Sequence, residues 1–422
     1  MTDPEGTGPE AAVAAPGCPV QPDAPLLSGL EHHQTPSQLY RRLRAEHGAI
    51  APVVLDGGIP AWLVLGYTEV TYVTSHDELF GRDSRRWNQW GSIPEDWPMM
   101  PFLRHQPSVL FAEGAEHQQR AGVITEALEA VDQFELAQLC RELAEGLIDT
   151  FAGSGGAELM ASYAHAVPMH AVVRLCGMAP DSQDTEDLVR DLGISLDAAE
   201  SDNPVAAYRR AQERIELLVK EKRENPGPDI TSRMLAHPVG LTDEEIVQDL
   251  IALIAAAQQP TTNWICNTLR LLLTDDRFAL NVSGGRLSVG QALNEVLWLD
   301  TPMQNYIGRW AVRDTRLGGQ HIRAGDCLVL GLAAANTDPQ IWPEGHIGAE
   351  NSAHLSFGNG EHRCPYPGPL LADVIARTAV ETLLERLPDV VLAVEPYELT
   401  WRPSILMRGL TSLPVTFTPV VQ

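Results

Sequence analysis

The sequence predicts a mainly α-helical fold with small β-sheets, organised as one large domain. Three observations predict this class. Helical apolar periodicity dominates residues 115–273, short strand-like runs lie on both sides of that region, and no repeat or low-complexity linker divides the 422 residues. The segment 1–25 is rich in Gly, Pro, Ala and acidic residues without an apolar period, which predicts a disordered leader before a domain spanning 26–422.

The first elements of the domain follow from short-range patterns. Residues 35–47 have the apolar spacing of a helix, whereas residues 51–55 and 62–65 are short apolar runs typical of strands. Gly57 and Gly58 lie between the two runs, and adjacent glycines favour the tight turn of a hairpin. The sequence therefore predicts a helix followed by a β-hairpin.

A long central helix is predicted from its start signal. Thr242 and Glu245 have the spacing of a capping box, in which each side chain bonds the backbone N–H of the other residue. An apolar helical pattern follows to about Leu273. The remaining predicted elements are a helix at 293–299, strands at 311–317 and 327–332, a helix at 370–387 that Pro388 stops, and strands and turns across 390–417.

Composition excludes several classes of function. Apolar residues make up 44% and charged residues 20% of the chain, so a sizeable core can form. The formal charge of −26 repels nucleic acid and anionic lipid, which excludes both as partners. The longest apolar run, 250–257, is far shorter than the ~18 residues of a membrane span. No signal peptide is recognised, and cysteines without paired spacing are typical of thiols in the cytoplasm.

The segment 357–364, which reads FGNGEHRC, is the main candidate for chemistry. Its two glycines let the backbone turn closely around a bound group, and the helix predicted just beyond Cys364 favours negative charge on the sulfur. Spacing alone leaves two other interpretations open. One is a glycine-rich turn followed by an ordinary buried cysteine, and the other is a zinc site made of His354, His362 and Cys364.

Several segments together resemble the bacterial type of the cytochrome P450 superfamily. Residues 354–364, HLSFGNGEHRC, are similar to its haem-binding signature. Further similar segments are 61–64, 317–325, 335–339 and 401–414. The resemblance covers most of the chain from about residue 35. It implies a single large triangular, mainly helical domain that binds haem b, with Cys364 as the ligand of the iron.

The resemblance also implies which residues contact the haem. Arg309 matches the family's arginine for the haem propionates, and buried propionates need such cations or donors. The family spaces a helix histidine and arginine four apart, whereas His117 and Arg120 are three apart here. Each histidine could instead be an ordinary core or surface residue. The complete expected set is His117, Arg120, Arg309, His354, Phe357, Gly358, His362 and Cys364.

The expected catalytic residues depart from the family pattern. Gln259 stands where the family has an acid on its central helix, and Pro260 stands where it has a threonine. Thr261 and Thr262 follow and remain candidates for that hydroxyl. Glutamine cannot deliver a proton as a carboxyl does, although it can orient water. The alternative is that these residues only shape a bend in the helix.

Two more departures concern the support of the cysteine. The family's Glu-x-x-Arg pair is Glu295 followed by Trp298 here, and tryptophan cannot form the ion pair. The family's glycine two residues after the cysteine is also missing, because residues 365–368 read PYPG. These features resemble an actinobacterial subgroup of the family that lacks the pair.

The resemblance implies a monooxygenase that inserts one oxygen atom from O2 into a small lipophilic substrate, by hydroxylation or epoxidation. Electrons are expected from a ferredoxin and its reductase, since the chain has no glycine motif for a flavin or nicotinamide cofactor. Two alternatives remain open at this point. One is a haem protein without oxygenase activity, acting as a sensor or assembly partner, and the other is a peroxide-dependent enzyme.

Overall fold

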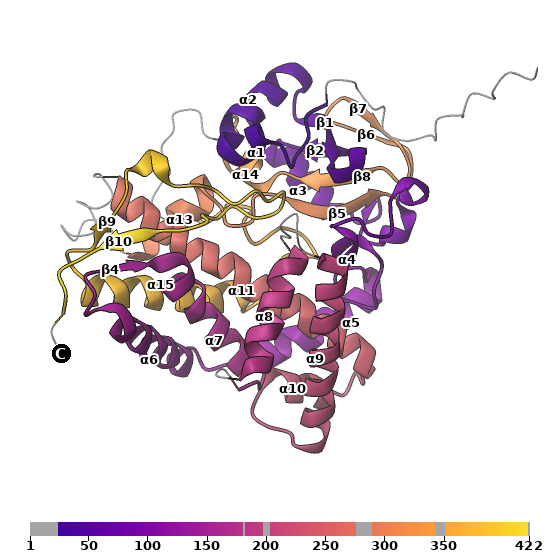
Figure 1. The fold of residues 1–422 in the computed structure, drawn as a ribbon. Coiled ribbons are helices and arrows are strands. Elements are labelled where there is room, and N and C mark those ends of the chain that lie inside the picture. Colours follow the sequence, from indigo (N-terminus) through magenta and orange to yellow (C-terminus); the bar gives the residue numbers. More distant parts are fainter. Residues whose placement is uncertain (1–23, 180–181, 197–202, 276–288, 342–350, 421–422) are drawn as a thin grey trace, which may run out of the picture.

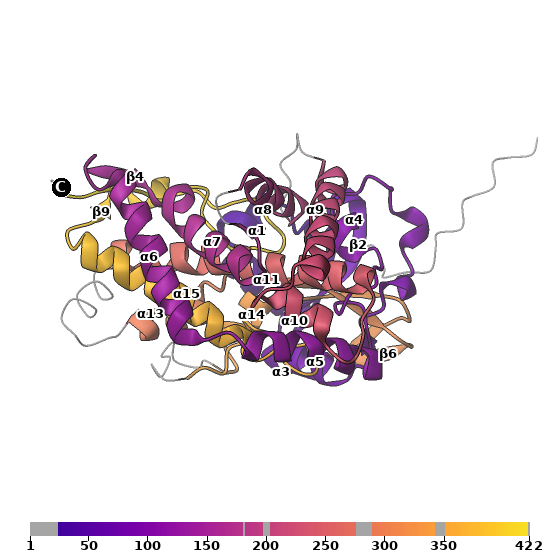
Figure 2. The ribbon, with the colours of Figure 1, turned by 90° about the horizontal axis from the view of Figure 1, so that it is seen from below.

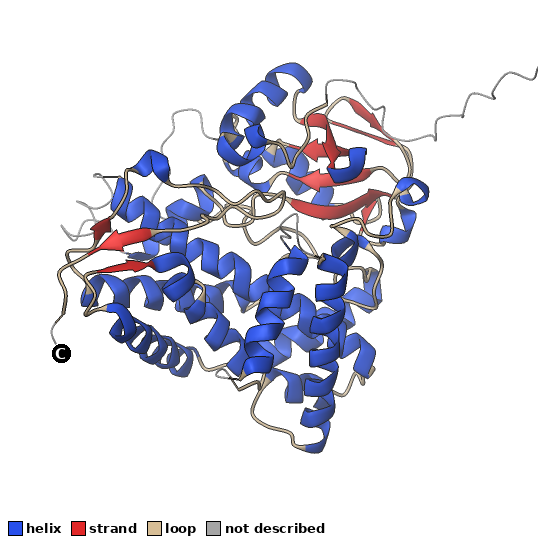
Figure 3. Cartoon of the chain, in the orientation of Figure 1, coloured by secondary structure: helices blue, strands red, loops and turns tan. Residues whose placement is uncertain are grey.

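The computed structural model describes residues 24–179, 182–196, 203–275, 289–341 and 351–420. Figure 1 shows a roughly triangular outline, in which helices fill most of the body and the larger sheet lies at one corner. Figure 3 shows the same division into a helical part and sheet-rich parts. The predicted class, mainly helical with small sheets, is therefore confirmed. The predicted leader lies almost entirely outside the described residues.

Within the described residues, the larger sheet has the strand order β1-β2-β8-β5-β3. Its strands are β1 (Ile50–Leu55), β2 (Ile59–Val64), β3 (Phe80–Gly81), β5 (Tyr306–Ala311) and β8 (Cys327–Leu330). β1 and β2 pair in antiparallel fashion, and Gly57 in the turn between them has a φ of +75°. The predicted hairpin is therefore confirmed.

The prediction of one continuous strand over residues 311–317 is wrong. β5 ends where that strand was expected to begin, and β6 (Thr315–Leu317) pairs instead with β7 (Gln320–Ile322). Gly318 and Gly319 have φ values of +53° and +83°, so they turn the chain back within a separate small hairpin.

The centre of the helical body is α11 (Asp243–Thr274). Its start is the predicted capping box, because the Glu245 N–H donates to Thr242 Oγ1 at 3.3 Å and the Thr242 N–H donates to Glu245 Oε2 at 2.8 Å. The helix continues through Pro260. Proline has no N–H, so the carbonyl of Ala256 loses its regular partner within the helix.

Among the described helices, those that contact α11 most extensively are α7 (Ala166–Leu175), α9 (Pro204–Glu224), α13 (Val289–Leu299) and α15 (Gly368–Arg386). Figure 2 shows α6 (Gln133–Phe151) running along α15 on the outer side. The helices predicted at 293–299 and 370–387 are therefore present as α13 and α15. Both begin earlier than predicted, since sequence patterns place helix ends less well than helix centres.

The remaining elements connect these parts. They are α1 (Leu30–Gln34), α2 (Pro36–His47), α3 (Tyr67–Ser75), α4 (Met100–Leu103), α5 (Gly114–Glu129), α8 (Gln183–Leu196), α10 (Ile230–Ala236) and α14 (Leu332–Asn336), with β4 (Gly156–Glu158), β9 (Val391–Leu392) and β10 (Pro414–Thr416) in a smaller sheet. None of the helices in the described part of the chain combines the length and apolarity needed to cross a membrane.

Candidate active site

The loop that carries Cys364 is a tight turn closed by its own backbone. The N–H of Cys364 donates to the carbonyl of Phe357 at 2.8 Å. Gly358 and Gly360 have φ values of +75° and +77°, a region that favours glycine. Phe357 also lies beside the central helix, with its ring 5.9 Å from that of Trp264. The loop and α11 therefore face each other across the interior.

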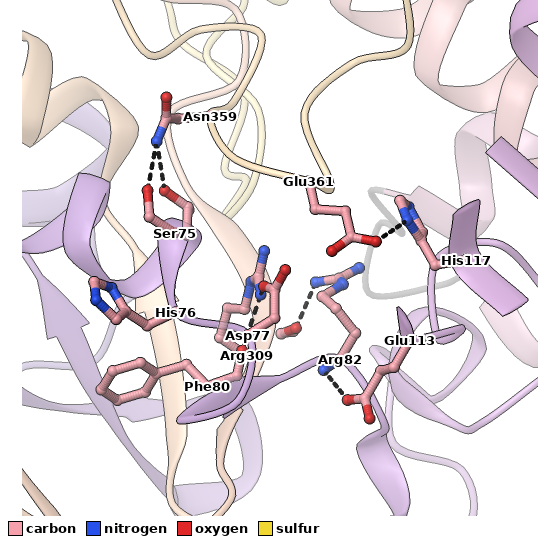
Figure 4. A network of polar contacts seen from close by, with 12 residues as sticks. Ser75, His76, Asp77, Phe80, Arg82, Glu113, His117, Arg309, Asn359 and Glu361 are labelled. Carbon is pink, nitrogen blue, oxygen red and sulfur yellow. Dashed lines mark hydrogen bonds and ion pairs between the residues drawn. The ribbon is translucent and has the colours of Figure 1, made fainter. Parts of the chain in front are cut away.

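The loop is fastened to α3. Asn359 Nδ2 donates to Thr74 Oγ1 at 3.1 Å and to Ser75 Oγ at 3.3 Å (Figure 4). A side chain at Gly360 would overlap the backbone carbonyl of Thr74. The glycine is therefore required both by its backbone conformation and by the close approach of α3.

Gly360→Ala is expected to lower the free energy of unfolding more than Gly58→Ala. Both glycines have nearly the same φ, +77° and +78°, but no atom lies within 4 Å of a side chain built at Gly58. The control should cost about 1–2 kcal/mol from backbone strain, and Gly360→Ala about 1–3 kcal/mol more from the overlap. Urea unfolding of both variants measures the difference, and equal losses would contradict this packing.

Gly368 takes the place of the glycine that the family pattern puts two residues after the cysteine. It begins α15, and a Cβ built on it would lie 2.9 Å from Cys364 Sγ. The small residue beside the sulfur is thus present, two positions later than the family places it. The intervening Pro-Tyr-Pro segment moves this glycine away from the usual position.

The protein alone does not stabilise the thiolate of Cys364. Burial raises the pKa of this thiol to about 12. In the protein without a metal, the cost of desolvation outweighs the favourable effect expected from the N-terminus of the following helix. A bound metal cation would offset that cost.

Three of the predicted haem contacts gather beside the loop. The rings of His117 and His362 are 3.8 Å apart between centroids, and His117 Nδ1 lies 3.3 Å from Glu361 Oε1. Arg309 is 2% exposed, donates to the Phe80 carbonyl at 2.9 Å and forms an ion pair with Asp77. Figure 4 shows His117 and Arg309 converging on the same region from α5 and β5.

The electrostatics of this group suit an anionic ligand. Burial lowers the pKa of His362, and the nearby cations Arg82 and Arg309 lower it further. Burial likewise lowers the pKa of His117, with Glu361 opposing the shift. Buried donors and cations that repel one another are relieved by an anion, so the group fits the two propionates of a haem. The residues present therefore fit the cofactor that the resemblance implies.

His354 lies apart from this group. Its ring packs edge-on against Trp298 at 5.9 Å and lies 5.9 Å from the ring of Phe357. Its Nδ1 is buried and has no hydrogen-bond partner among the described atoms. The structure thus places His354 behind the loop, as a side chain that supports Phe357, rather than with the cations.

The stability of the protein is expected to fall as the pH drops from 6.5 toward 4, in part through His354. Burial lowers the pKa of His354 from 6.5 to about 4, so the unfolded chain binds a proton in this window that the folded chain does not. The loss amounts to at most about 3 kcal/mol. Urea unfolding at several pH values should show a shallower pH dependence for His354→Phe, and parallel curves would contradict the assignment.

Trp298 replaces the missing ion pair with hydrogen bonds. Its Nε1 donates to the carbonyl of Asn351 at 2.7 Å, and Asn294 Nδ2 donates to the same carbonyl at 2.9 Å. Ser356 Oγ also donates to the carbonyl of Leu297, the residue before Trp298, at 2.8 Å. These bonds tie α13 to the segment that leads into the cysteine loop, which is the task of the ion pair in the family.

Arg120 binds two carboxylates of the central helix. Its Nη2 lies 2.8 Å and its Nε 3.1 Å from the carboxylate of Asp249, and its Nη1 lies 3.2 Å from Glu245 Oε1. Both acids are on α11, and Asp249 is fully buried. The structure thus assigns Arg120 to the α5–α11 contact, and we leave it out of the proposed haem contacts.

A partly open cavity of about 130 Å³ lies along α11. Ala252, Ala255 and Ala256 form its helical wall, and no aspartate or glutamate borders it. Its wall is largely apolar and includes Met99, Phe102, Leu103, Leu110, Phe111, Leu192, Ile251, Met303, Ile307, Leu406 and Met407, with Gln106, Ser108, Ser195, Tyr208, Gln248, Asn305 and Tyr306 as neutral polar groups.

The three predicted catalytic side chains differ in their placement. Gln259 lies four positions after Ala255 and three after Ala256, both of which line the cavity. This spacing places Gln259 on the same face of α11. Thr261 Oγ1 instead donates to the Ala257 carbonyl at 2.6 Å, and Thr262 Oγ1 accepts from Gln258 Nε2 at 3.2 Å. Both hydroxyls therefore bond within the helix.

Sequence reasoning missed Arg82, which lies next to His117 and Arg309 in Figure 4 and also borders the cavity. It directly follows the short strand β3, and no sequence motif marks it. A buried arginine cannot be told from a surface arginine without the tertiary fold. The zinc interpretation receives no support, because no group of three His, Cys, Asp or Glu suited to a metal occurs among the described residues.

No family model matches the chain. Nocardicin C N-oxygenase from Nocardia uniformis subsp. tsuyamanensis is 30% identical over 392 residues, covering 90% of this chain and 94% of that protein. The cytochrome P450 monooxygenase PikC from Streptomyces venezuelae is 29% identical over 399 residues, covering 92% of each chain. Among solved structures, CYP154C4 from Streptomyces sp. W2061 matches with a TM-score of 0.85 at 27% identity, covering 93% of this chain and 97% of that chain.

The similarity extends along nearly the whole chain and is not confined to the cysteine loop. The two relatives are named as oxygenases, and the loop, the buried cations and the cavity have the composition that haem and an apolar substrate require. The chain therefore belongs to the cytochrome P450 superfamily, and it is a haem-dependent monooxygenase.

Proposed function

We propose that the protein oxygenates a small neutral lipophilic molecule held in the cavity along α11. The main supporting observation is that this cavity, which no acid borders, is lined in part by the same Arg82 that lies beside His117 and Arg309. We therefore propose that the substrate space adjoins the cofactor space at Arg82. Most of the wall is apolar, and burial of apolar surface is the main source of affinity in such a site.

We propose haem b as the cofactor, with Cys364 as the ligand of its iron. His117, Arg309 and His362 would hold the propionates, while Phe357 and Gly358 would cover the ring on the side of the loop. When bound, haem supplies an iron that activates oxygen, and a thiolate ligand favours cleavage of the oxygen–oxygen bond. The chain contributes binding, orientation and exclusion of water.

Gln259 is the proposed distal polar residue. It continues the cavity face of α11 and is 5% exposed. Its carboxamide can donate and accept hydrogen bonds and so orient a water molecule, but it has no acidic proton. Thr261 and Thr262 are proposed to act through the shape of the helix, because their hydroxyls already bond within it.

Neutral polar groups in the wall point to the substrate class. The Tyr208 hydroxyl donates to Gln248 Oε1, and both residues border the cavity. Burial raises the pKa of Tyr208, so its hydroxyl stays neutral. Such a pair can exchange a hydrogen bond with a hydroxyl, ether or carbonyl group, whereas a cationic substrate would find no acid in the cavity wall. We therefore propose a lipophilic substrate with one or two neutral polar groups.

We propose that a ferredoxin and its reductase supply the electrons, because the chain has no glycine motif for a flavin or nicotinamide cofactor. The cytoplasm is the proposed compartment. None of the described cysteines forms a disulfide, and Cys140, Cys176 and Cys266 are buried thiols.

A second candidate reaction uses peroxide in place of O2 and electrons. Its overall balance is one substrate C–H bond and one hydrogen peroxide giving one alcohol and one water. The observation that favours it is the absence of an acid from the cavity wall, together with glutamine at position 259. Comparing turnover with a ferredoxin system and with peroxide, at matched substrate occupancy, decides between the two reactions.

A titration tests the proposed substrate site. Ferric holoprotein is titrated with neutral lipophilic compounds while the shift from low to high spin is followed. Ala256→Leu should weaken the binding of an active compound by about tenfold, or 1.4 kcal/mol, because it fills the cavity. Ala257→Leu adds the same volume on a neighbouring face that does not border the cavity. Equal effects of both variants, or no shift and no product with any compound, would overturn the proposal.

A further inference from the structure

Arg82 is a buried cation without an acidic partner. It follows β3 directly and is 3% exposed. Its Nε donates to the Leu110 carbonyl at 2.9 Å, its Nη2 donates to the Tyr306 hydroxyl at 2.6 Å, and its Nη1 donates to the Gly308 carbonyl. These acceptors are neutral, and no carboxylate in the described part of the chain forms an ion pair with the guanidinium. A buried charge left in this state is costly.

The surroundings fix the guanidinium in place. Gly308 has a φ of +126°, and a Cβ built on it would lie 2.6 Å from Arg82 Nη1. The guanidinium carbon lies 4.8 Å from the centre of the Tyr306 ring. A guanidinium has five N–H donors, and three are used by these neutral acceptors. Two donors therefore remain on a rigidly held cation.

Arg82, with its two remaining donors, lies beside the residues proposed to hold the cofactor. Burial lowers the pKa of His117 and Arg309, and the charge of Arg82 lowers both further, so both lie within its field. Figure 4 shows its guanidinium between Arg309 and the His117–Glu361 pair. It also borders the cavity. An anion placed among these groups would contact several of them at once.

Helix α5 leaves a position for such a cation unfilled. Four residues after His117, where the family's helix arginine would share its face, the chain has Ala121. The neighbouring Arg120 is bound to Asp249 and Glu245 on α11. Neither residue can contribute a cation to the group around His117.

We infer that Arg82 binds a carboxylate of the haem and takes over the charge that α5 does not supply. The inference rests on the proposed haem site. A guanidinium with two free donors can bind a carboxylate through a charge-assisted, bidentate contact. The other possible source of a carboxylate is a fatty-acid-like substrate in the cavity, since Arg82 borders both spaces.

The test compares haem with its dimethyl ester, in which both carboxylates are neutral. Apoprotein is reconstituted with each compound, and the rate constant of release is measured by transfer to apomyoglobin. Arg82→Gln should speed the release of haem by about 10- to 100-fold and leave the release of the ester nearly unchanged. Arg82→Lys should retain part of the preference for the acid. Arg85→Gln, at a 68% exposed side chain of the same segment, is the control and should behave as wild type.

The outcomes separate the possible failures. Equal acceleration for haem and ester in Arg82→Gln would show a purely structural role and overturn the inference. Dodecanoate binding that depends on Arg82, with haem and ester released alike, would assign the arginine to substrate and also overturn it. Failure of the wild-type chain to bind either compound would instead overturn the haem site itself. The free energy of unfolding of the apoprotein provides a readout independent of haem. It should not be lower in Arg82→Gln than in the wild type.

Discussion

Cys364→Ser is expected to remove the thiolate signature from the optical spectrum and to lower oxygenation by more than about 100-fold. The thiolate is the group that favours cleavage of the oxygen–oxygen bond, and a serine hydroxyl cannot donate the same charge to iron. The rest of the site should survive, since the group around His117, His362 and Arg309 does not include the sulfur. The variant should therefore still take up some haem.

The measurement is the difference spectrum of the reduced protein with carbon monoxide, together with product formation. Cys140→Ala is the matched control. Cys140 is likewise a buried thiol, but it lies on α6. The control should keep both spectrum and turnover while losing about 1 kcal/mol of stability. A thiolate spectrum in Cys364→Ser would contradict the assignment of the ligand.

Trp298→Ala is expected to lower the free energy of unfolding by about 3–5 kcal/mol, because it removes a large buried side chain and leaves a cavity. The same change removes one of the two hydrogen bonds to the Asn351 carbonyl, which hold the segment leading into the cysteine loop. Haem occupancy should therefore fall together with stability. Urea unfolding and the haem-to-protein absorbance ratio measure the two effects.

The hydrogen bond of Trp298 can be separated from its packing by a second pair of variants. Trp298→Phe removes an N–H that is bonded at 2.7 Å and should cost about 0.5–1.5 kcal/mol. Trp310→Phe removes a buried N–H that has no hydrogen-bond partner among the described atoms, so its polar contribution to the loss should be close to zero. A larger loss for Trp310→Phe would show that packing, and not the bond to Asn351, explains the role of Trp298.

The sequence predicts features that depend on near neighbours in the chain. The capping box at Thr242 and Glu245 and the hairpin at Gly57 need only a few adjacent residues, and both are present in the structure. The prediction of one strand over 311–317 was wrong. Gly318 and Gly319 turn the chain back, so residues 315–317 pair with the strand that follows these glycines. The predicted turn of the cysteine loop also follows from local glycines.

The parts of the site that were missed depend on contacts between distant residues. The sequence does not distinguish the surroundings of Arg120 from those of Arg82. Only the fold shows that Asp249 binds the first and that, among the described residues, no carboxylate forms an ion pair with the second. The replacement of the usual glycine by Gly368 is equally invisible in the sequence. It becomes evident from the distance between its Cβ position and the sulfur.

The central claim is that the sulfur of residue 364 ligates a haem iron. X-ray absorption at the iron edge of the purified holoprotein tests this most directly, because it reports the elements bound to the metal. The account predicts one sulfur neighbour in the wild-type protein and none in Cys364→Ser. A first shell of only nitrogen and oxygen in the wild-type protein would contradict it.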